Sequence, residues 1–352
     1  MGTSMSRCMM DDHDFEQPGD QAMTFQQMTG MRALPTAGQF LWCLAVICSL
    51  TLGSITTFGA EGGVVAQQEG DQIAITIDGQ PFTTLHLGKD LKKPYFWPLL
   101  AADGAILTRP IEPGEKEHPH HKGLWISIDE VNHSKHWMER EPIVNRGATI
   151  EKGAGEKVVI RLENEWLNGD GQAQLRETTR WTITRNRLIA AEIVLEPLVD
   201  DVTMGDTKEG FFAVRIAQTM RELQGGKILT ANGKTKTKEA WGQPAQWIDY
   251  SGKVNEKTYG VTILDDATNF RPGRYHVRDY GLFTVSPFGE GSYQNDMTLS
   301  KPVVLAARGA KQTVKLRYGL WVHSGVPTAE EIQKVYEGFL TEGRTENPKK
   351  AG

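Results

Sequence analysis

The segment QIAITIDGQPFTTLHL, residues 72–87, decides the fold class because it reads as two strands joined by a tight turn. Isoleucine occupies every second position from Ile73 to Ile77, so one face of the first strand is apolar. Asp78 and Gly79 form a dipeptide typical of two-residue hairpin turns, and PFTTLHL follows it as the second strand. The segment therefore predicts an antiparallel β-hairpin.

Runs with the same period of two recur along the chain. They include KVVIRLENEW, TTRWTITRNRLIAAEIVLEPL, FFAVRIAQTM, YGVTILDD, YGLFTVSPF and QTVKLRYGLWVH. Links such as NGDG separate them and suit tight turns. Because strands do not alternate with long helices and no repeat period is present, the sequence predicts an all-β protein. We expect one large antiparallel β-sandwich domain over residues 61–352.

One long helix is expected near the end of the sandwich, in PTAEEIQKVYEGF at 327–339. Thr328 is a typical N-cap, and Glu331 three residues later completes a capping box. The apolar stripe of this helix consists of Ile332, Val335, Tyr336 and Phe339. Such a stripe predicts that the helix docks on the flank of a sheet.

The composition is that of a soluble globular protein, with 39% hydrophobic and 24% charged residues among 352. The formal net charge is only −5, and no block of lysine and arginine interleaves with aromatic residues. Nucleic-acid binding needs such a basic surface, so we expect no nucleic-acid partner. Nothing in the sequence indicates an oligomeric state.

An apolar segment at 40–60, FLWCLAVICSLTLGSITTFGA, looks like a secretory signal. The residues before it are too acidic for the start of a signal, so we expect translation to begin at Met31 and residues 31–60 to be the signal peptide. The protein is then exported to the periplasm or outside the cell. One uncleaved membrane anchor is the alternative, because about 20 apolar residues can span a bilayer. The three cysteines, all before residue 60, suit export to an oxidising compartment; they are Cys8, Cys43 and Cys48.

The segment EKEHPHHKGLWISIDEVNHSKHW, residues 115–137, holds five of the nine histidines. They are His118, His120, His121, His133 and His136. We expect His133 and His136 to be solvated loop residues. Trp125 and Trp137 can offer flat apolar faces to a sugar ring, while imidazoles hydrogen-bond to its hydroxyls.

Two kinds of chemistry are open to this cluster. In an extended segment His118 and His120 project to one face and can hold a divalent metal ion, with His276 as a further ligand. Cupin-type sites begin with the same spacing but need a glutamate shortly afterwards, where this chain has KGLW. Alternatively, His120 or His121 acts with His276 as acid and base, because imidazole titrates near neutral pH.

Two further segments carry residues suited to the same site. Glu209 in GDTKEG precedes the strand FFAVRIA and can act as a carboxylate partner, whereas ordinary turn chemistry is the reading for Asp206 and Lys208. In YHVRDYGLF, residues two apart share a face of an extended chain, although a structural ion pair between Arg278 and Asp279 is the alternative. The predicted catalytic residues are His120, His121, Glu209 and His276. The predicted substrate-binding residues are Trp125, Arg215, Trp247, Arg278, Asp279 and Tyr280, with Trp247 as a sugar platform or simple packing.

Five motifs in one order carry a family resemblance: EHPHHKGLWISIDEVNHSKHW, GDTKEGFFAVRIA, GGKILTANG, AWGQPAQWIDYSG and YHVRDYGLFTVSPFG. With them the chain resembles the bacterial PmoA family, which is labelled methane oxygenase and is otherwise a domain of unknown function. The resemblance extends from about residue 70 to about residue 340 and implies sugars, by analogy with proteins of polysaccharide-degrading bacteria. Methane oxidation is not expected, because a methane-oxidising membrane subunit needs several apolar runs of about 20 residues.

The sequence therefore predicts an exported carbohydrate-active protein that uses histidine and glutamate for acid–base chemistry on a sugar or glycoside, as an epimerase, lyase or hydrolase. A metal-dependent oxygenase or lyase and a non-catalytic glycan-binding protein are the alternatives. Mutarotase-like supersandwiches use a concave sheet face with a similar mixture of residues. By that analogy we expect the histidine loop, the Arg278 strand and the Glu209 turn to meet on the open face of a curved sheet.

Overall fold

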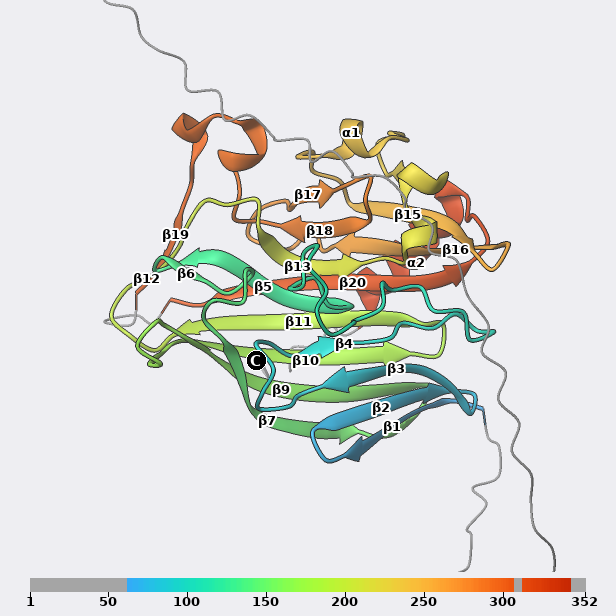
Figure 1. Ribbon diagram of the computed structural model, residues 1–352, viewed down its shortest axis with the longest axis horizontal. Helices are drawn as coiled ribbons and strands as arrows, with labels where there is room; N and C mark the ends of the chain where they lie inside the picture. Colours follow the sequence, from blue (N-terminus) through green and yellow to red (C-terminus); the bar gives the residue numbers. More distant parts are fainter. Residues whose placement is uncertain (1–61, 307–311, 343–352) are drawn as a thin grey trace, which may run out of the picture. The chain divides into compact units, whose positions relative to one another are not determined.

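The computed structural model describes residues 62–306 and 312–342 of the chain. In this part of the chain the strands form two antiparallel sheets (Figure 1). The first, here called the large sheet, has the order β17-β18-β13-β5-β4-β3-β2-β1-β8, with β6 and β12 paired to β5 and β19 paired to β12. The second sheet has the order β14-β15-β16-β20-β11-β10-β9-β7.

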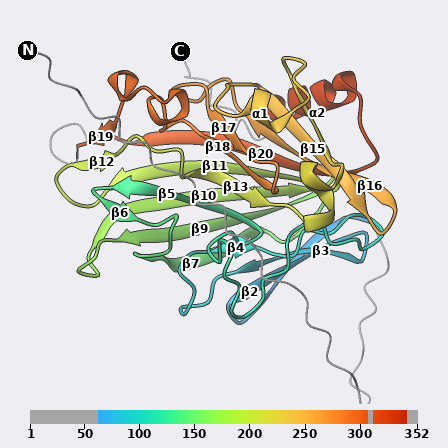
Figure 2. The same cartoon turned by 45° about the horizontal axis from the view of Figure 1, so that its top comes forward.

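The strands of the large sheet are β1 (Val64–Glu69), β2 (Gln72–Ile77), β3 (Gln80–His86), β4 (Tyr95–Phe96), β5 (Leu124–Val131), β6 (Ser134–Lys135), β8 (Ala154–Gly155), β12 (Val202–Met204), β13 (Gly210–Arg215), β17 (Arg274–Val277), β18 (Leu282–Ser286) and β19 (Val303–Leu305). Those of the second sheet are β7 (Ile143–Lys152), β9 (Lys157–Leu167), β10 (Ala173–Thr184), β11 (Leu188–Pro197), β14 (Lys227–Thr230), β15 (Trp247–Val254), β16 (Lys257–Asp265) and β20 (Val314–Ser324). The long strands β9, β10, β11 and β20 lie side by side in both views (Figure 1; Figure 2).

The predicted hairpin is confirmed as β2 and β3, which pair antiparallel with Ile77 opposite Gln80. Asp78 and Gly79 between them both have positive φ, 52° and 75°, as a type I′ turn requires. The three alternating isoleucines of β2 are buried in the main core. Register and burial therefore agree along this hairpin, as the pattern in the sequence requires.

The main core lies between the two sheets. Phe96 of the large sheet packs edge-on against Trp181 of the second sheet, with ring centroids 4.9 Å apart. Phe212 of the large sheet stacks on Tyr318 of the second at 5.5 Å. Aromatic pairs of this kind add to the free energy of burial. The all-β antiparallel sandwich predicted from the sequence is confirmed.

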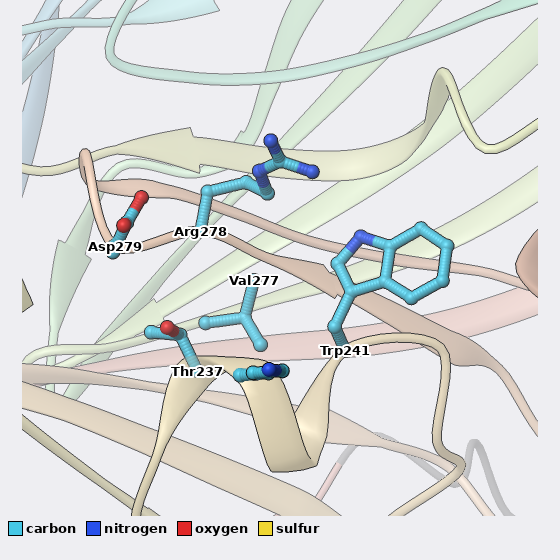
Figure 3. Close-up of a pocket in the computed structure, with 6 residues that line it drawn as sticks. Thr237, Trp241, Val277, Arg278 and Asp279 are labelled. Atoms are coloured by element: carbon cyan, nitrogen blue, oxygen red, sulfur yellow. The ribbon is translucent and has the colours of Figure 1, made fainter. Parts of the chain in front are cut away.

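The predicted C-terminal helix is confirmed as α2 (Ala329–Thr341), whose N-terminus carries the Thr328 and Glu331 capping box. Its buried residues pack on the outer face of the second sheet, in a cluster of Leu188, Ala190, Trp247, Leu264, Ile332, Tyr336 and Phe339. The other α-helix, α1 (Thr237–Ala240), is a single turn next to β17. Figure 3 shows its Thr237 beside Val277 of that strand.

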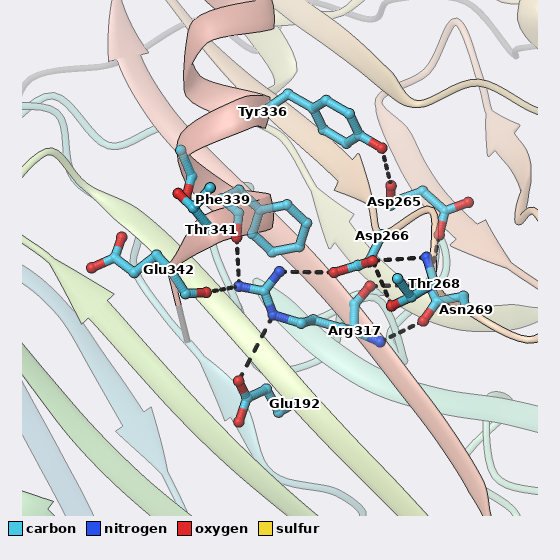
Figure 4. Close-up of polar contacts among 11 residues, drawn as sticks. Glu192, Asp265, Asp266, Thr268, Asn269, Arg317, Tyr336, Phe339, Thr341 and Glu342 are labelled. Atoms are coloured by element: carbon cyan, nitrogen blue, oxygen red, sulfur yellow. Dashed lines mark hydrogen bonds and ion pairs between the residues drawn. The ribbon is translucent and has the colours of Figure 1, made fainter. Parts of the chain in front are cut away.

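Arg317 of β20 fastens the end of α2 to the second sheet (Figure 4). Its Nη2 donates to the carbonyls of Phe339, at 2.7 Å, and Glu342. Its Nη1 donates to the buried carboxylate of Asp266 at 2.9 Å. A cation at the C-terminus of a helix satisfies carbonyls that have no partner within the helix. The guanidinium also lies 3.9 Å over the ring of Phe339.

We expect Arg317→Met to lower the free energy of unfolding by about 3 kcal/mol, because it leaves the buried Asp266 carboxylate without its partner. Arg180→Met is the matched control, since Arg180 pairs with Glu151 at 2.8 Å where both side chains are one-third exposed. That change should cost less than about 1 kcal/mol. Urea unfolding of the two variants measures the difference, and equal losses would contradict the structural role given to Arg317.

The predictions made for the N-terminal segment lie outside the described residues. They are the signal peptide at 31–60, the start at Met31 and the context of the three cysteines. The single domain expected over 61–352 likewise includes residues beyond the described ranges. Within those ranges no helix is both long and apolar enough to cross a membrane.

Candidate functional site

The outer face of the large sheet, opposite the main core, is built by one row of paired residues. The register places Tyr95 opposite Trp125, Trp125 opposite Ala213, and Ala213 opposite Thr284. Thr284 in turn lies opposite His276 of β17. Since directly paired residues project to the same side of a sheet, one face collects residues from β4, β5, β13, β18 and β17.

A second apolar cluster covers this outer face. Its buried members are Tyr95, Trp125, Trp137, Ala213 and Leu282, and the partly buried Leu91, Trp97, Ile111 and Tyr280 pack against it. The loops at 109–122 and 135–141 supply residues that close over the cluster. The face is therefore a floor of rings and aliphatic side chains with polar groups above it.

Buried cations hold the histidine-rich loop on this floor. Arg109 donates to the carbonyls of Glu117 and His118, both at 2.7 Å, and to that of His121 at 3.2 Å. Lys93 donates to the carbonyl of His120 at 2.8 Å. Because these cations bind backbone oxygens, the hydrogen bonds that hold the loop do not depend on the identity of the loop side chains.

Four rings stack in a column on the floor. Trp125 and His121 have centroids 5.6 Å apart, His121 and His118 4.7 Å, and His118 and Tyr280 5.3 Å. The three interplanar angles are 20°, 9° and 12°, so the planes are nearly parallel. His118 is the open imidazole of the column, with 39% of its side chain exposed. Trp125 and Trp137 are buried, so the prediction that they offer faces to a sugar is wrong.

Burial favours the neutral form of the imidazoles of His118, His120 and His121. Burial lowers the pKa of His120 to about 4 and lowers that of His121 further. Burial also lowers the pKa of His118, and the nearby positive charge of Arg215 acts in the same direction. A neutral imidazole can accept a proton, and Nδ1 of His118 and of His121 has no hydrogen-bond partner among the described residues.

Tyr280 lies where the three segments singled out in the sequence meet. The guanidinium of Arg215 lies 4.7 Å from its ring centroid and that of Arg278 lies 5.5 Å from it. His118 stacks on the same ring. The turn that carries Glu209 is joined to the strand before Arg278 by His276, whose Nδ1 lies 3.1 Å from the Lys208 carbonyl oxygen. The histidine loop, the Arg278 segment and the Glu209 turn therefore come together on the outer face.

Glu209 is a carboxyl group in a partly buried position, with 29% of its side chain exposed. Burial raises its pKa, against the lowering effect of Lys208, whose Nζ lies 3.6 Å from Oε1. His276 fixes the turn that carries Glu209, because Nδ1 of His276 lies 3.1 Å from the carbonyl oxygen of Lys208. The pKa of the buried His276 is lowered to about 3, chiefly by burial.

A cavity of about 390 Å³ adjoins this region, lined by Thr237, Lys238, Trp241, Val277, Arg278 and Asp279 (Figure 3). Arg278 and Asp279 thus face a hollow that can take a small ligand. Trp241 also lies near His276, with ring centroids 6.2 Å apart. The indole Nε1 of Trp241 has no hydrogen-bond partner among the described residues.

The structure removes Trp247 from the site. This residue begins β15 in the second sheet, is buried under α2 and donates from Nε1 to Gln333 at 3.1 Å. The prediction that it serves as a sugar platform beside the other residues is wrong, and the alternative of packing holds. Sequence periodicity gave its strand but not the sheet to which that strand belongs.

Sequence reasoning missed several residues of the site. Arg109 and Lys93 stand outside any recognisable motif, and Trp241 belongs to the motif AWGQPAQWIDYSG but was not singled out, so only position in space marks these residues. Asp129 was not among the predicted residues, yet it is buried on β5 and accepts a hydrogen bond from the Met138 N–H at 3.2 Å. Burial raises its pKa to about 6, and the charge of Glu209 adds to the effect.

His133 is exposed as expected, but the same expectation for His136 is wrong. His136 is fully buried against Trp166, with ring centroids 5.0 Å apart, and its Nδ1 lies 3.1 Å from the carbonyl of Glu141. Burial lowers its pKa to about 4, although Glu141 acts to raise it and Lys93 lowers it slightly. Two neighbouring histidines in one turn thus differ completely in environment.

We expect the stability advantage of the wild-type protein over His136→Asn to narrow by about 2 kcal/mol between pH 7 and pH 5. Folding keeps this imidazole neutral, whereas the unfolded chain binds a proton below a pH of about 6.5, so acidification favours unfolding. Asparagine can keep the hydrogen bond to Glu141 but does not titrate. Urea unfolding at the two pH values measures the gap, and a constant or widening gap would contradict the buried neutral state.

The described residues contain no group of three or more His, Cys, Asp or Glu side chains arranged to hold a metal ion. His118 and His120 lie together in the loop, with ring centroids 5.9 Å apart, while His276 is engaged with the Lys208 carbonyl. The divalent metal ion at His118, His120 and His276 stays a prediction.

A wider cavity of about 660 Å³ lies on the second sheet beside α2 and is lined in part by Trp321, His323 and Arg187. Behind it, His323 Nε2 lies 2.7 Å from the Asp249 carboxylate. That carboxylate also accepts hydrogen bonds from Thr262 and Ser251, so its charge is well compensated. We place the candidate site on the large sheet, because His118 and the guanidinium groups of Arg215 and Arg278 meet there around Tyr280.

The sequence of residues 72–337 matches a family of unknown function, DUF6807. The chain belongs to this family. DUF6807 brings no activity with it, and the resemblance to the PmoA family stays a prediction. No curated protein matches this DUF6807 chain in sequence.

Several solved structures are similar to this DUF6807 chain at 10% sequence identity. Galactose 1-epimerase from Lactobacillus acidophilus has a TM-score of 0.39, with 75% of this chain and 98% of that chain covered. A putative aldose 1-epimerase from Klebsiella pneumoniae has a TM-score of 0.36, with coverage of 78% and 85%. The GH36 α-galactosidase from Geobacillus stearothermophilus has a TM-score of 0.39, and this chain spans only 41% of its length.

Proposed function

We propose that this protein binds a carbohydrate or a sugar-derived small molecule on the outer face of the large sheet and catalyses proton transfer on it. The observation that supports the proposal is the surroundings of Tyr280. An open imidazole, a partly buried carboxyl group and two guanidinium groups from three chain segments gather around that ring. Rings, cations and acid–base groups together suit a polyhydroxylated ligand.

His118 and Glu209 are the proposed acid–base pair. The pKa of His118 is lowered and that of Glu209 is raised, both mainly by burial, so the two values are displaced towards each other. Groups with such pKa values can take up and release protons near the working pH without a large energetic cost. In this proposal His118 accepts a proton from a sugar carbon or hydroxyl and Glu209 delivers one, or the reverse.

The other predicted catalytic residues are proposed to position this pair. His121 stacks beneath His118 and His120 lies against His121, with ring centroids 4.4 Å apart. His276 holds the Lys208 carbonyl, next to Glu209 in the chain. Arg278, at the 390 Å³ cavity, is proposed to bind substrate oxygens, because a guanidinium offers several donors in a fixed plane. The apolar segment at 40–60 supports the further proposal that the protein works outside the cytoplasm.

We expect His118→Gln and Glu209→Gln each to lower turnover at least 100-fold, the usual contribution of a general acid or base. Proton nuclear magnetic resonance of purified full-length protein with aldoses, uronates and aryl glycosides would detect epimer formation, elimination or hydrolysis. His133→Asn is the matched control, because this exposed loop histidine lies outside the stack.

Other outcomes would assign the protein differently. Sugar binding in calorimetry without turnover, unchanged in both variants, would make it a glycan-binding protein. Stoichiometric iron, copper or zinc that is lost on replacing His118 and His120 by alanine would favour the metal-dependent oxygenase or lyase. The absence of both binding and turnover across the panel would overturn the carbohydrate proposal.

A further inference from the structure

Arg215 is a cation buried on the outer face without an adequate partner. Only 1% of its side chain is exposed, and its Nε and Nη1 have no hydrogen-bond partner among the described residues. Its Nη2 lies 3.5 Å from Oε1 of Glu117, longer than a good charge-assisted hydrogen bond. Burying a cation lowers the stability of the fold unless an anion compensates its charge.

The charges around Arg215 make the shortage of negative charge more severe. Its backbone N–H and carbonyl bond to the segments of Gly123 and Arg109, so the guanidinium of Arg109 is close and repels it. Arg278 shares the ring of Tyr280 with it. The nearby carboxylates are those of Glu115, 3.9 Å from Arg109, and Glu117, both at the surface end of the loop.

Glu117 is the carboxylate that lies next to Arg215, but its contacts there are weak. Its side chain is 55% exposed, and Nδ1 of His118, the other nitrogen near its carboxylate, is 3.7 Å away. A carboxylate that is half in water and beyond normal hydrogen-bond distance from both partners can leave at little cost. A ligand carboxylate in the same place could bridge Nη1 and Nη2 of Arg215, since a guanidinium binds a carboxylate through two parallel donors.

We propose that the sugar bound at this site carries a carboxylate, as a uronate or another sugar acid, and that Arg215 binds this carboxylate after Glu117 has moved aside. Arg278, 5.5 Å from the centroid of the same Tyr280 ring, adds to the positive field that attracts it. The inference rests on the proposed function and names its substrate class. A neutral sugar would leave the charge of Arg215 without a bound anion at Nη1 and Nη2, which is the basis of the selectivity.

Calorimetric titration of the full chain with galacturonate and glucuronate, against galactose and glucose, tests the proposal. We expect the wild-type protein to bind a uronate at least tenfold more tightly than its neutral parent. Arg215→Gln should abolish this ratio, and Arg215→Lys should lower it, since lysine keeps the charge but not the paired donors. The exposed Arg146→Gln on the second sheet is the matched control and should keep the ratio.

Glu117→Gln gives the second arm and does not depend on the folding of an Arg215 variant. Removing the competing carboxylate should tighten uronate binding severalfold more than galactose binding. Weaker uronate binding in Glu117→Gln would overturn the displacement of Glu117, and equal binding of uronates and neutral sugars by the wild type would overturn the anion site while the sugar site stands. Tighter binding of galactose 6-sulfate than of galacturonate would overturn the choice of a carboxylate. Binding of none of these sugars would count against the proposed function itself.

Discussion

Three hydrogen bonds from one buried guanidinium hold the histidine-rich loop on the large sheet. Arg109 binds the carbonyls of Glu117, His118 and His121, which together span the tightest part of the loop. Hydrogen bonds from charged donors contribute about 1.5–3 kcal/mol each, so this one side chain can outweigh the entropy of ordering several loop residues. The ring column, the exposure of His118 and its contact with Tyr280 all depend on the loop staying where Arg109 puts it.

The anchoring of the loop by buried cations also explains why several polar and charged groups lie out of contact with water in this region. Arg109 makes its short hydrogen bonds to backbone carbonyls, and the nearest carboxylate, that of Glu115, is 3.9 Å away, whereas Lys93 binds both a carbonyl and the Glu139 carboxylate. Burial lowers the pKa of His118, the charge of Arg215 acts in the same direction, and Arg215 itself has only a distant carboxylate partner in Glu117. The cations that hold the loop in place therefore also influence which ligands can bind above it.

The sequence was most informative where a structure is decided locally. The Asp78-Gly79 hairpin and the Thr328 capping box follow from residues a few positions apart, and both occur as predicted. The meeting of the His118 loop with the Arg278 segment was expected by analogy, and the two segments are indeed in contact through Tyr280. Local patterns specify dihedral angles and faces, which is sufficient for elements of this kind.

Sequence patterns were less informative where burial depends on distant elements. Alternation placed Trp125 and Trp247 on strand faces, but it could not show that His121 covers one and helix α2 covers the other. His136 was placed in solvent because its neighbours are polar, yet Trp166 from the second sheet closes over it. Arg109 and Lys93 carry no local signal at all, because the carbonyls that Arg109 binds are eight or more positions away and the partners of Lys93 are more than twenty positions away.

The ring column has a consequence for how this surface can change its ligand. Trp125 and His121 act as a foundation that sets the height of His118 above the sheet, and neither reaches solvent. Substitutions at the rim, at Glu117, Arg278 or Asp279, leave that foundation in place, because those side chains lie outside the packed rings. The buried rings that support His118 are thus separate from the side chains around the site. Relatives with the same buried rings can therefore differ in the molecules that they recognise.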